Sequence, residues 1–166
     1  MRPPGGADRR WWAAVAVAAL LCGGAGWSYA RAAGEATRAY AESRDTALAA
    51  GREHVARLSS LDGRRAEEGL RTWLEVSAGE LREELERTKP PADVSARATV
   101  TDAALTALDD RAGTARLIAT VRVEITAAVR TAGPPATDRK RLEADLVRTG
   151  DGWKVTALTA LPATGT

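Results

Sequence analysis

The sequence predicts a mixed α+β protein, in which a single N-terminal transmembrane helix precedes three helices packed on a curved four-stranded antiparallel sheet. Three observations lead to this prediction. Residues 11–30 carry no charge, residues 47–88 place apolar side chains at helical spacing, and residues from Asp93 onward alternate apolar and polar side chains as strands do. Because the helices precede the strands as a group, the order favours α+β over a parallel α/β sheet. A sheet curved over helices in this way forms a cone with an apolar interior.

The uncharged segment 11–30 has the properties of a membrane anchor. At about 1.5 Å per residue, a helix of this length spans about 30 Å, which is the thickness of the hydrocarbon core of a bilayer. Amphipathic rings prefer the lipid headgroups, and the segment has such rings near both ends. They are Trp11, Trp12, Trp27 and Tyr29.

Three other signals would make this segment a leader instead of an anchor. A secretory signal peptide cleaved at the small residues around Arg31 is the main alternative, although Trp27 and Tyr29 just before that site fit it poorly. A lipoprotein signal at Cys22 needs a small residue before the cysteine, where this chain has Leu21. A twin-arginine export signal needs other residues after its arginines. We therefore expect an uncleaved anchor.

Charge sets the expected topology. Two arginines directly precede the anchor, so residues 1–10 are predicted to be a cytoplasmic tail and the rest of the chain to be exported. Beyond the anchor we expect a helical stalk at 31–46, one α+β domain at 47–162 and a C-terminal tail at 163–166. The first 30 residues account for the whole formal net charge of +2. The exported part is thus neutral and lacks the basic footprint of a nucleic-acid-binding protein.

Three helices are expected before the sheet. The first continues from the stalk to about residue 58 and places apolar or small residues on one face. They are Leu48, Gly51, Val55 and Leu58. Asp62 is the expected N-cap of a second helix at about 64–75, because its carboxylate can accept hydrogen bonds from first-turn amides. The residues expected to be buried there are Leu70, Trp73 and Leu74.

Ser77 and Glu80 have the spacing of a capping box and predict a third helix at about 78–88. Leu81 and Leu85 are expected to be buried on that helix. Pro90 and Pro91 follow it, and neither can donate a backbone hydrogen bond, so the helix must stop before them.

Four strands are predicted at about 94–108, 114–130, 139–149 and 153–161, the last beginning with Trp153 and Val155. Between them we expect a turn at 109–113, a loop at 131–137 and a tight hairpin at 150–152. Inner faces are expected to carry Val94, Ala96, Ala98, Val100, Leu117, Ala119, Val121, Val123, Ile125, Leu142, Ala144 and Leu146. Acids and arginines alternate onto the other face, so no titratable pair is expected in the cone, and we predict no enzyme.

Other candidates for chemistry have simpler interpretations. The single histidine, His54, is expected to be a solvated helix residue beside Glu53, and Cys22 lies inside the anchor. The acids at 80–86 alternate with Arg82 and Arg87 at helical spacing, as an exposed helix face does. The basic residues Arg139, Lys140 and Arg141 beside Asp138 are interpreted as a charged strand edge that discourages strand pairing. No catalytic, cofactor-binding or metal-binding residue is predicted.

The order of these elements resembles the actinobacterial Mce-associated membrane proteins, where Mce stands for mammalian cell entry. The similarity extends over roughly residues 10–162. It rests on Leu48-Ala49-Ala50-Gly51-Arg52, Leu58-Ser59-Ser60-Leu61-Asp62, Val76-Ser77-Ala78-Gly79-Glu80-Leu81, Val100-Thr101-Asp102-Ala103-Ala104-Leu105, Leu146-Val147-Arg148, Gly152-Trp153-Lys154-Val155 and Leu158. At Gly63 the chain departs from the family, which often has an aromatic residue there.

The resemblance implies a single-pass membrane protein whose exported domain has the NTF2-like, or SnoaL-like, cone fold. It further implies a non-enzymatic accessory or assembly subunit of an Mce-type lipid or sterol transport system of the cell envelope. The implied partners are the membrane, subunits of the Mce complex and a lipid or sterol, without nucleic acid and without a cofactor. Two alternatives stay open: an exported domain that holds an apolar ligand in its cone, and a SnoaL-like isomerase or hydrolase.

Overall fold

The structure is a computed structural model that describes residues 31, 34–35, 37–89, 94–127 and 136–162 of the 166-residue chain. The chain divides into two units, Met1–Glu42 and Ser43–Thr166, and the second unit contains the sheet. No helix in the described residues is long and apolar enough to cross a membrane. The predicted anchor at 11–30 lies outside the described residues, as do the tails at 1–10 and 163–166.

A long helix covers residues 37–58, and its part from Ser43 onward packs on the sheet. Ser43, Ala47, Gly51 and Val55 are buried at intervals of four residues, which places them on one face of the helix. Of the predicted face, Gly51 and Val55 are confirmed as buried, whereas Leu48 and Leu58 are only partly buried at the margin of the core.

The long helix is followed by a short connection and a second helix. Asp62 is the N-cap of a 3-10 turn η1 (Gly63–Arg65), and its carboxylate accepts a hydrogen bond from the amide of Arg64. The turn leads into α2 (Ala66–Val76), close to the predicted range. The buried residue of α2 is Val76, whereas the predicted Leu70, Trp73 and Leu74 are half-buried.

The third helix, α3 (Gly79–Arg87), begins without the predicted capping box. Its N-cap is Ala78, which makes no side-chain capping bond, and the hydroxyl of Ser77 donates to the carbonyl of Leu74. Ser77 is buried because it forms an isolated parallel bridge with Val155, and the adjacent Ala78 amide donates to the Val155 carbonyl at 2.8 Å. Leu81 and Leu85 are half-buried, and Leu81 packs against the hydrophobic core, so the predicted burial is only partial.

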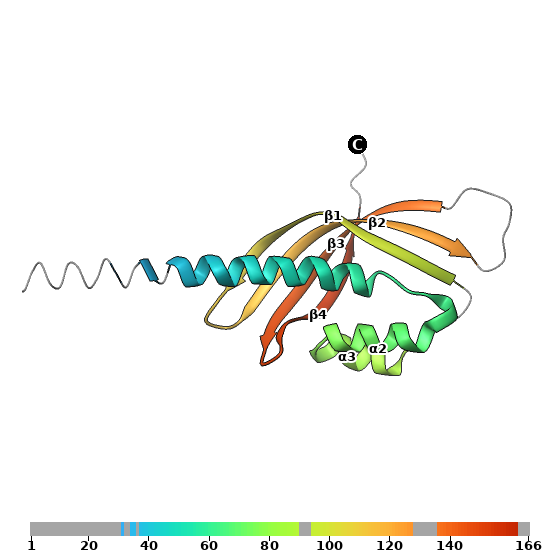
Figure 1. The fold of residues 1–166 in the computed structure, drawn as a ribbon, viewed down its shortest axis with the longest axis horizontal. Coiled ribbons are helices and arrows are strands. Elements are labelled where there is room, and N and C mark those ends of the chain that lie inside the picture. The colour runs from blue at the N-terminus through green and yellow to red at the C-terminus, as the bar shows by residue number, and fades with distance from the viewer. Residues whose placement is uncertain (1–30, 32–33, 36, 90–93, 128–135, 163–166) are drawn as a thin grey trace, which may run out of the picture. The chain divides into compact units, whose positions relative to one another are not determined.

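The sheet is an antiparallel meander in the order β1-β2-β3-β4, as predicted (Figure 1). Its strands are β1 (Val94–Asp109), β2 (Thr114–Ala127), β3 (Ala136–Thr149) and β4 (Gly152–Leu161). Register shifts between Val100 and Asp102 and between Leu105 and Ala107 interrupt β1, where bulges bend a strand. The third strand begins at Ala136, earlier than predicted, so part of the expected loop at 131–137 is strand.

The inner face of the sheet and the long helix form one hydrophobic core (Figure 1). The buried strand residues are Ala98, Ala115, Leu117, Ala119, Val121, Val123, Leu142, Ala144, Leu146, Trp153 and Val155. Ile125 was predicted to be among them but is 36% exposed. It pairs with Ala96 and Ala136 near the end of β2, beyond Val123, which is the last buried residue of that strand among the described residues.

Candidate functional site

An open cleft of about 1010 Å³ lies where the long helix ends. Its walls come from the last turn of that helix, the connection at 60–64, helix α2, the beginning of β1 and the end of β2. Charged side chains contribute to the lining alongside apolar ones. They are Glu53, Arg57, Asp62, Arg64, Arg97 and Glu124. The lining of the cleft is therefore mixed, with charged and apolar side chains.

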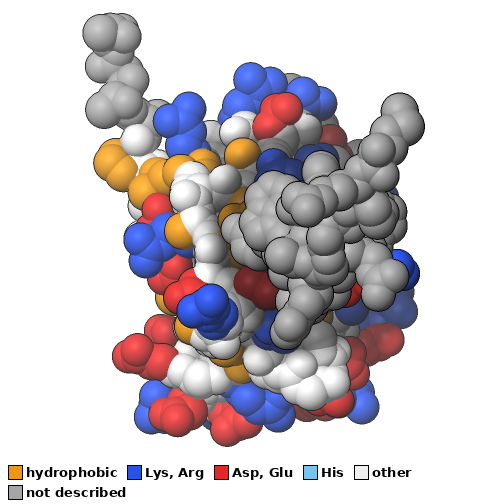
Figure 2. Space-filling model, turned by 90° about the vertical axis from the view of Figure 1, so that its left-hand side faces the viewer, with side chains coloured by type: hydrophobic (Ala, Val, Ile, Leu, Met, Phe, Trp, Pro, Cys, Tyr) orange, Lys and Arg blue, Asp and Glu red, His pale blue; other side chains and the backbone are white. Residues whose placement is uncertain are grey.

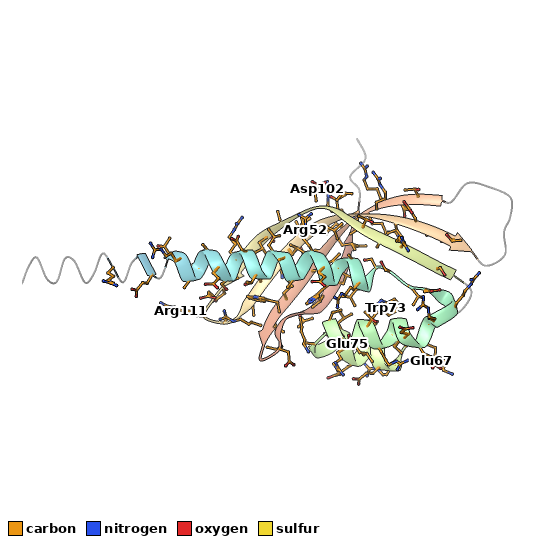
Figure 3. The ribbon with its side chains drawn as sticks, viewed as in Figure 1. Arg52, Glu67, Trp73, Glu75, Asp102 and Arg111 are labelled. Carbon is orange, nitrogen blue, oxygen red and sulfur yellow. The ribbon has the colours of Figure 1, made fainter. Side chains whose placement is uncertain are left out.

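Trp73 forms one wall of the cleft and holds the end of the long helix (Figure 3). Its indole Nε1 donates to the carbonyls of Arg57 and Ser60, at 2.9 and 3.0 Å. The Arg57 carbonyl also accepts from the Ser60 amide at 3.1 Å, so the indole is a second donor to this carbonyl at the end of the helix. Trp73 thus connects α2 to the long helix through a polar contact as well as by packing.

Ser60 joins the end of the helix to the edge of β1. Its hydroxyl donates to the carbonyl of Ala56 at 2.8 Å and accepts from the amide of Ala98 at 3.0 Å. The next residue, Leu61, exchanges two 2.8 Å backbone hydrogen bonds with Ala96. The free edge of β1 is thereby covered at the cleft.

Two of the three carboxylates that line the cleft, those of Glu53 and Asp62, are engaged in local contacts. Glu53 pairs with Arg57 one helical turn away, and Asp62 accepts from the Arg64 amide and lies 3.4 Å from Arg65. No group of three or more His, Cys, Asp or Glu that could hold a metal occurs in the described part of the chain. Glu124 is the third acid that lines the cleft.

His54 does not have the solvated position that the sequence predicts. The side chain is half-buried, and its Nδ1 is buried without a hydrogen-bond partner among the described residues. Burial lowers the pKa of this imidazole, and the charges of Arg57 and Lys154 lower it further, while Glu53 acts in the opposite direction. The sequence shows charged neighbours on the same helix, but not Lys154, which β4 supplies.

The outer face of the sheet, opposite the helix, carries charged side chains (Figures 2 and 3). Asp102 lies on that side in Figure 3, and basic side chains gather along the upper rim of Figure 2. Arg116 is 2.7 Å from Asp145 and 3.7 Å from Glu143, and these acids raise its pKa. The pairing predicted on α3 is confirmed for Arg82 and Glu86, at 3.1 Å.

The basic residues at 139–141 are divided between the two faces. Arg139 is directly opposite Arg122, and Arg141 is opposite Thr120, all on the outer face. Lys140 is opposite Val121 on the inner face and lies 3.8 Å from Asp138. Because β4 pairs with β3 only from Arg141 onward, Ala136–Lys140 form an edge within the described residues, which agrees with the predicted charged edge.

Three solved structures share this arrangement of helices and sheet. An IcmL-like type IV secretion system protein from Legionella pneumophila has a TM-score of 0.55 at 13% identity, covering 74% of this chain and 95% of that one. CagV, a VirB8 homolog from Helicobacter pylori, has a TM-score of 0.54 at 12% identity, covering 72% and 99%. An Ntf2-like protein involved in plasmid conjugation has a TM-score of 0.51 at 11% identity, covering 75% and 51%.

The fold is NTF2-like. This confirms the fold that the sequence resemblance implied. At such low identity, the likeness concerns the fold alone. No family model and no curated protein matches the sequence. Membership of the Mce-associated family therefore stays a prediction.

Proposed function

We propose that this chain is a non-enzymatic assembly subunit, anchored by residues 11–30, whose NTF2-like domain acts outside the cytoplasm in a multiprotein complex of the cell envelope. The proposed complex is an Mce-type lipid or sterol transport system. The anchor, the topology and the Mce partners come from the sequence. The assembly role also has support from the fold, because two similar structures are secretion-system proteins.

The observation that carries the proposal is the close packing of the long helix against the inner face of the sheet. A Cβ atom added to Gly51 would lie 3.2 Å from Cδ2 of Leu117 and 3.3 Å from Cδ2 of Leu146. These distances leave no room for a substrate between helix and sheet at this position. A domain filled in this way supports binding through its surface, and the cleft beside Trp73 is an open part of that surface.

Apolar ligand binding is the alternative function that the sequence leaves open. It requires an enclosed apolar space, whereas the cleft is open and partly lined by Arg57, Arg97 and Glu124. No specific contact favours the carrier function over the assembly function, so it stays a prediction.

The test is affinity capture of the tagged full-length protein from native membranes, with mass spectrometry of the recovered proteins and lipids. We expect Mce-type subunits at a stoichiometry comparable to that of the bait. A chain in which an unrelated transmembrane segment replaces residues 11–30 separates the contribution of the anchor from that of the folded domain. If the folded domain recruits the complex, this chain recovers the same subunits.

A tagged single-pass membrane protein of similar abundance is the matched control. Recovery of secretion-system subunits would retain the assembly role and overturn the Mce assignment. Recovery of the chain alone with bound lipid would overturn the assembly role in favour of the carrier. Recovery of neither proteins nor lipid above the control would overturn both.

A further inference from the structure

One segment of the sheet has a strand partner on only one side. Ala136–Lys140 of β3 pair with β2 over Val121–Ile125, and β4 pairs with β3 only from Arg141, opposite Leu161. Pro162 follows directly, and proline has no amide hydrogen with which to extend a ladder. Among the described residues, no strand covers the backbone of Ala136–Lys140 on its second side.

Three arginines flank this edge on the outer face. Arg122 and Arg139 are directly opposite each other, an arrangement in which like charges repel. Arg141 is two residues from Arg139 and therefore on the same face. None of these three arginines forms an ion pair with any described residue, although Arg116 on the same face pairs with two acids.

Acidic groups on the same face are few near this edge. Glu124 on β2 is opposite Thr137 on one side and Arg97 on the other. Asp102 is on β1, so strand β2 separates it from Arg141. Glu143 is in contact with Arg116. Among the described residues, the outer face around Arg139 and Arg141 therefore has an excess of positive charge, beside backbone groups that no described strand covers.

We propose that Ala136–Lys140 accept an extended acidic segment of a partner protein as an added strand beside β3. This inference rests on the proposed function, because it specifies the chemistry of a partner in the assembly. Backbone hydrogen bonds would supply binding energy, and carboxylates at alternate positions would lie beside Arg139 and Arg141. The same arginines would repel basic strands, which gives the edge selectivity.

Two other occupants fit the edge less well. A second copy of this chain, pairing through the same edge, would bring its basic cluster Arg139, Lys140 and Arg141 close to the same cluster of the first copy. A bilayer offers phosphates to the arginines but no extended backbone to pair with Ala136–Lys140.

The test measures binding of fluorescent ten-residue peptides to the full-length protein in nanodiscs. One peptide alternates Glu with Val, a second alternates Lys with Val, and a third is the Glu peptide with alternate backbone amides methylated. We expect the Glu peptide to bind at least about tenfold more tightly than the Lys peptide, which is about 1.4 kcal/mol. Methylation should abolish binding, because it removes backbone donors without changing charge.

A charge-reversed variant locates the site. Arg139→Glu with Arg141→Glu should reverse the preference between the Glu and Lys peptides. The matched control, Arg71→Glu with Arg87→Glu, reverses two exposed arginines on α2 and α3 and should leave both affinities unchanged. Equal effects of the two double variants, or tight binding of the methylated peptide, would overturn the inference.

Anionic vesicles are the comparison for a lipid partner. Binding of phosphatidylglycerol vesicles that requires Arg139 and Arg141, without binding of the Glu peptide, would overturn the inference. Peptide binding without recovery of any envelope complex would overturn the proposed function and leave this inference standing. A third outcome would overturn this inference alone. In it, the wild type recovers an envelope complex, the Arg139→Glu, Arg141→Glu variant recovers the same complex in full, and the wild type does not bind the Glu peptide.

Discussion

The hydroxyl of Ser43 donates a 2.6 Å hydrogen bond to Oδ1 of Asp110, which lies 67 residues further along the chain. The same carboxylate oxygen accepts from Nη1 of Arg148 at 3.0 Å, and Nη2 of Arg148 donates to the Asp110 backbone carbonyl at 2.8 Å. Arg148 also lies over the ring of Trp153, 5.7 Å from its centre. This cluster ties the long helix to the β1–β2 turn and to the end of β3.

Acid should weaken this cluster. The hydrogen bond from Ser43, with help from Arg148, lowers the pKa of the Asp110 carboxyl in the folded state. Its stabilising contribution is therefore complete above the pKa of the unfolded state and is lost as the pH falls through the lower folded value. We expect the melting temperature of the wild type to fall more steeply over this acidic range than that of Asp110→Asn. Circular dichroism melts test this, and parallel curves would contradict it.

Gly51 should be intolerant of a large side chain. Its face of the helix approaches Leu117 and Leu146 so closely that even a Cβ would contact both. We expect Gly51→Leu to lower the free energy of unfolding by about 1–3 kcal/mol through overpacking, measured by urea denaturation. Gly34→Leu is the control, because Gly34 is also helical but has nothing within 4 Å of an added Cβ. Equal loss in both variants would show that the packing at Gly51 is not tight.

Trp73→Phe keeps most of the ring but removes the single indole N–H that the carbonyls of Arg57 and Ser60 share. Because one donor is lost, we expect a decrease of about 0.5–1.5 kcal/mol in the free energy of unfolding. Thr101→Val is the control, since it removes an exposed 3.2 Å bond to the carbonyl of Thr120 and should cost less. If Thr101→Val lowers the free energy of unfolding as much as Trp73→Phe does, the indole hydrogen bonds do not stabilise the fold more than an exposed one.

Alternation and turn residues made the sheet predictable. The buried residues of β2 include every second position from Leu117 to Val123. Such alternation places them on one face of a strand, and it can be recognised from the sequence. Gly113 and Gly152 adopt positive φ angles of 64° and 107°, which the turns need and glycine provides without strain. Local signals of this kind are visible in one sequence.

Contacts between distant segments were not predictable in the same way. Ser77 and Glu80 have capping-box spacing, but a bridge to Val155 fixes Ser77 in another conformation. The contact between Ser43 and Asp110 and the open edge of β3 depend on which residues meet across strands, and sequence spacing does not reveal that register. The walls of the cleft come from five such segments, so the cleft could not be derived from any one of them.

His54 provides the sharpest test of burial at the end of the helix. Because burial and the charges of Arg57 and Lys154 lower its pKa against the effect of Glu53, the folded state binds this proton less readily than the unfolded state. Stability should therefore rise with pH between the lowered pKa and the ordinary value of 6.5, and this contribution should be flat above 6.5. His54→Leu should remove that slope without destabilising the protein at neutral pH, since Nδ1 has no described partner to lose. The chain has one histidine, so proton NMR of untagged protein reports its imidazole directly, and a pKa at or above 6.5 would contradict the burial of this side chain.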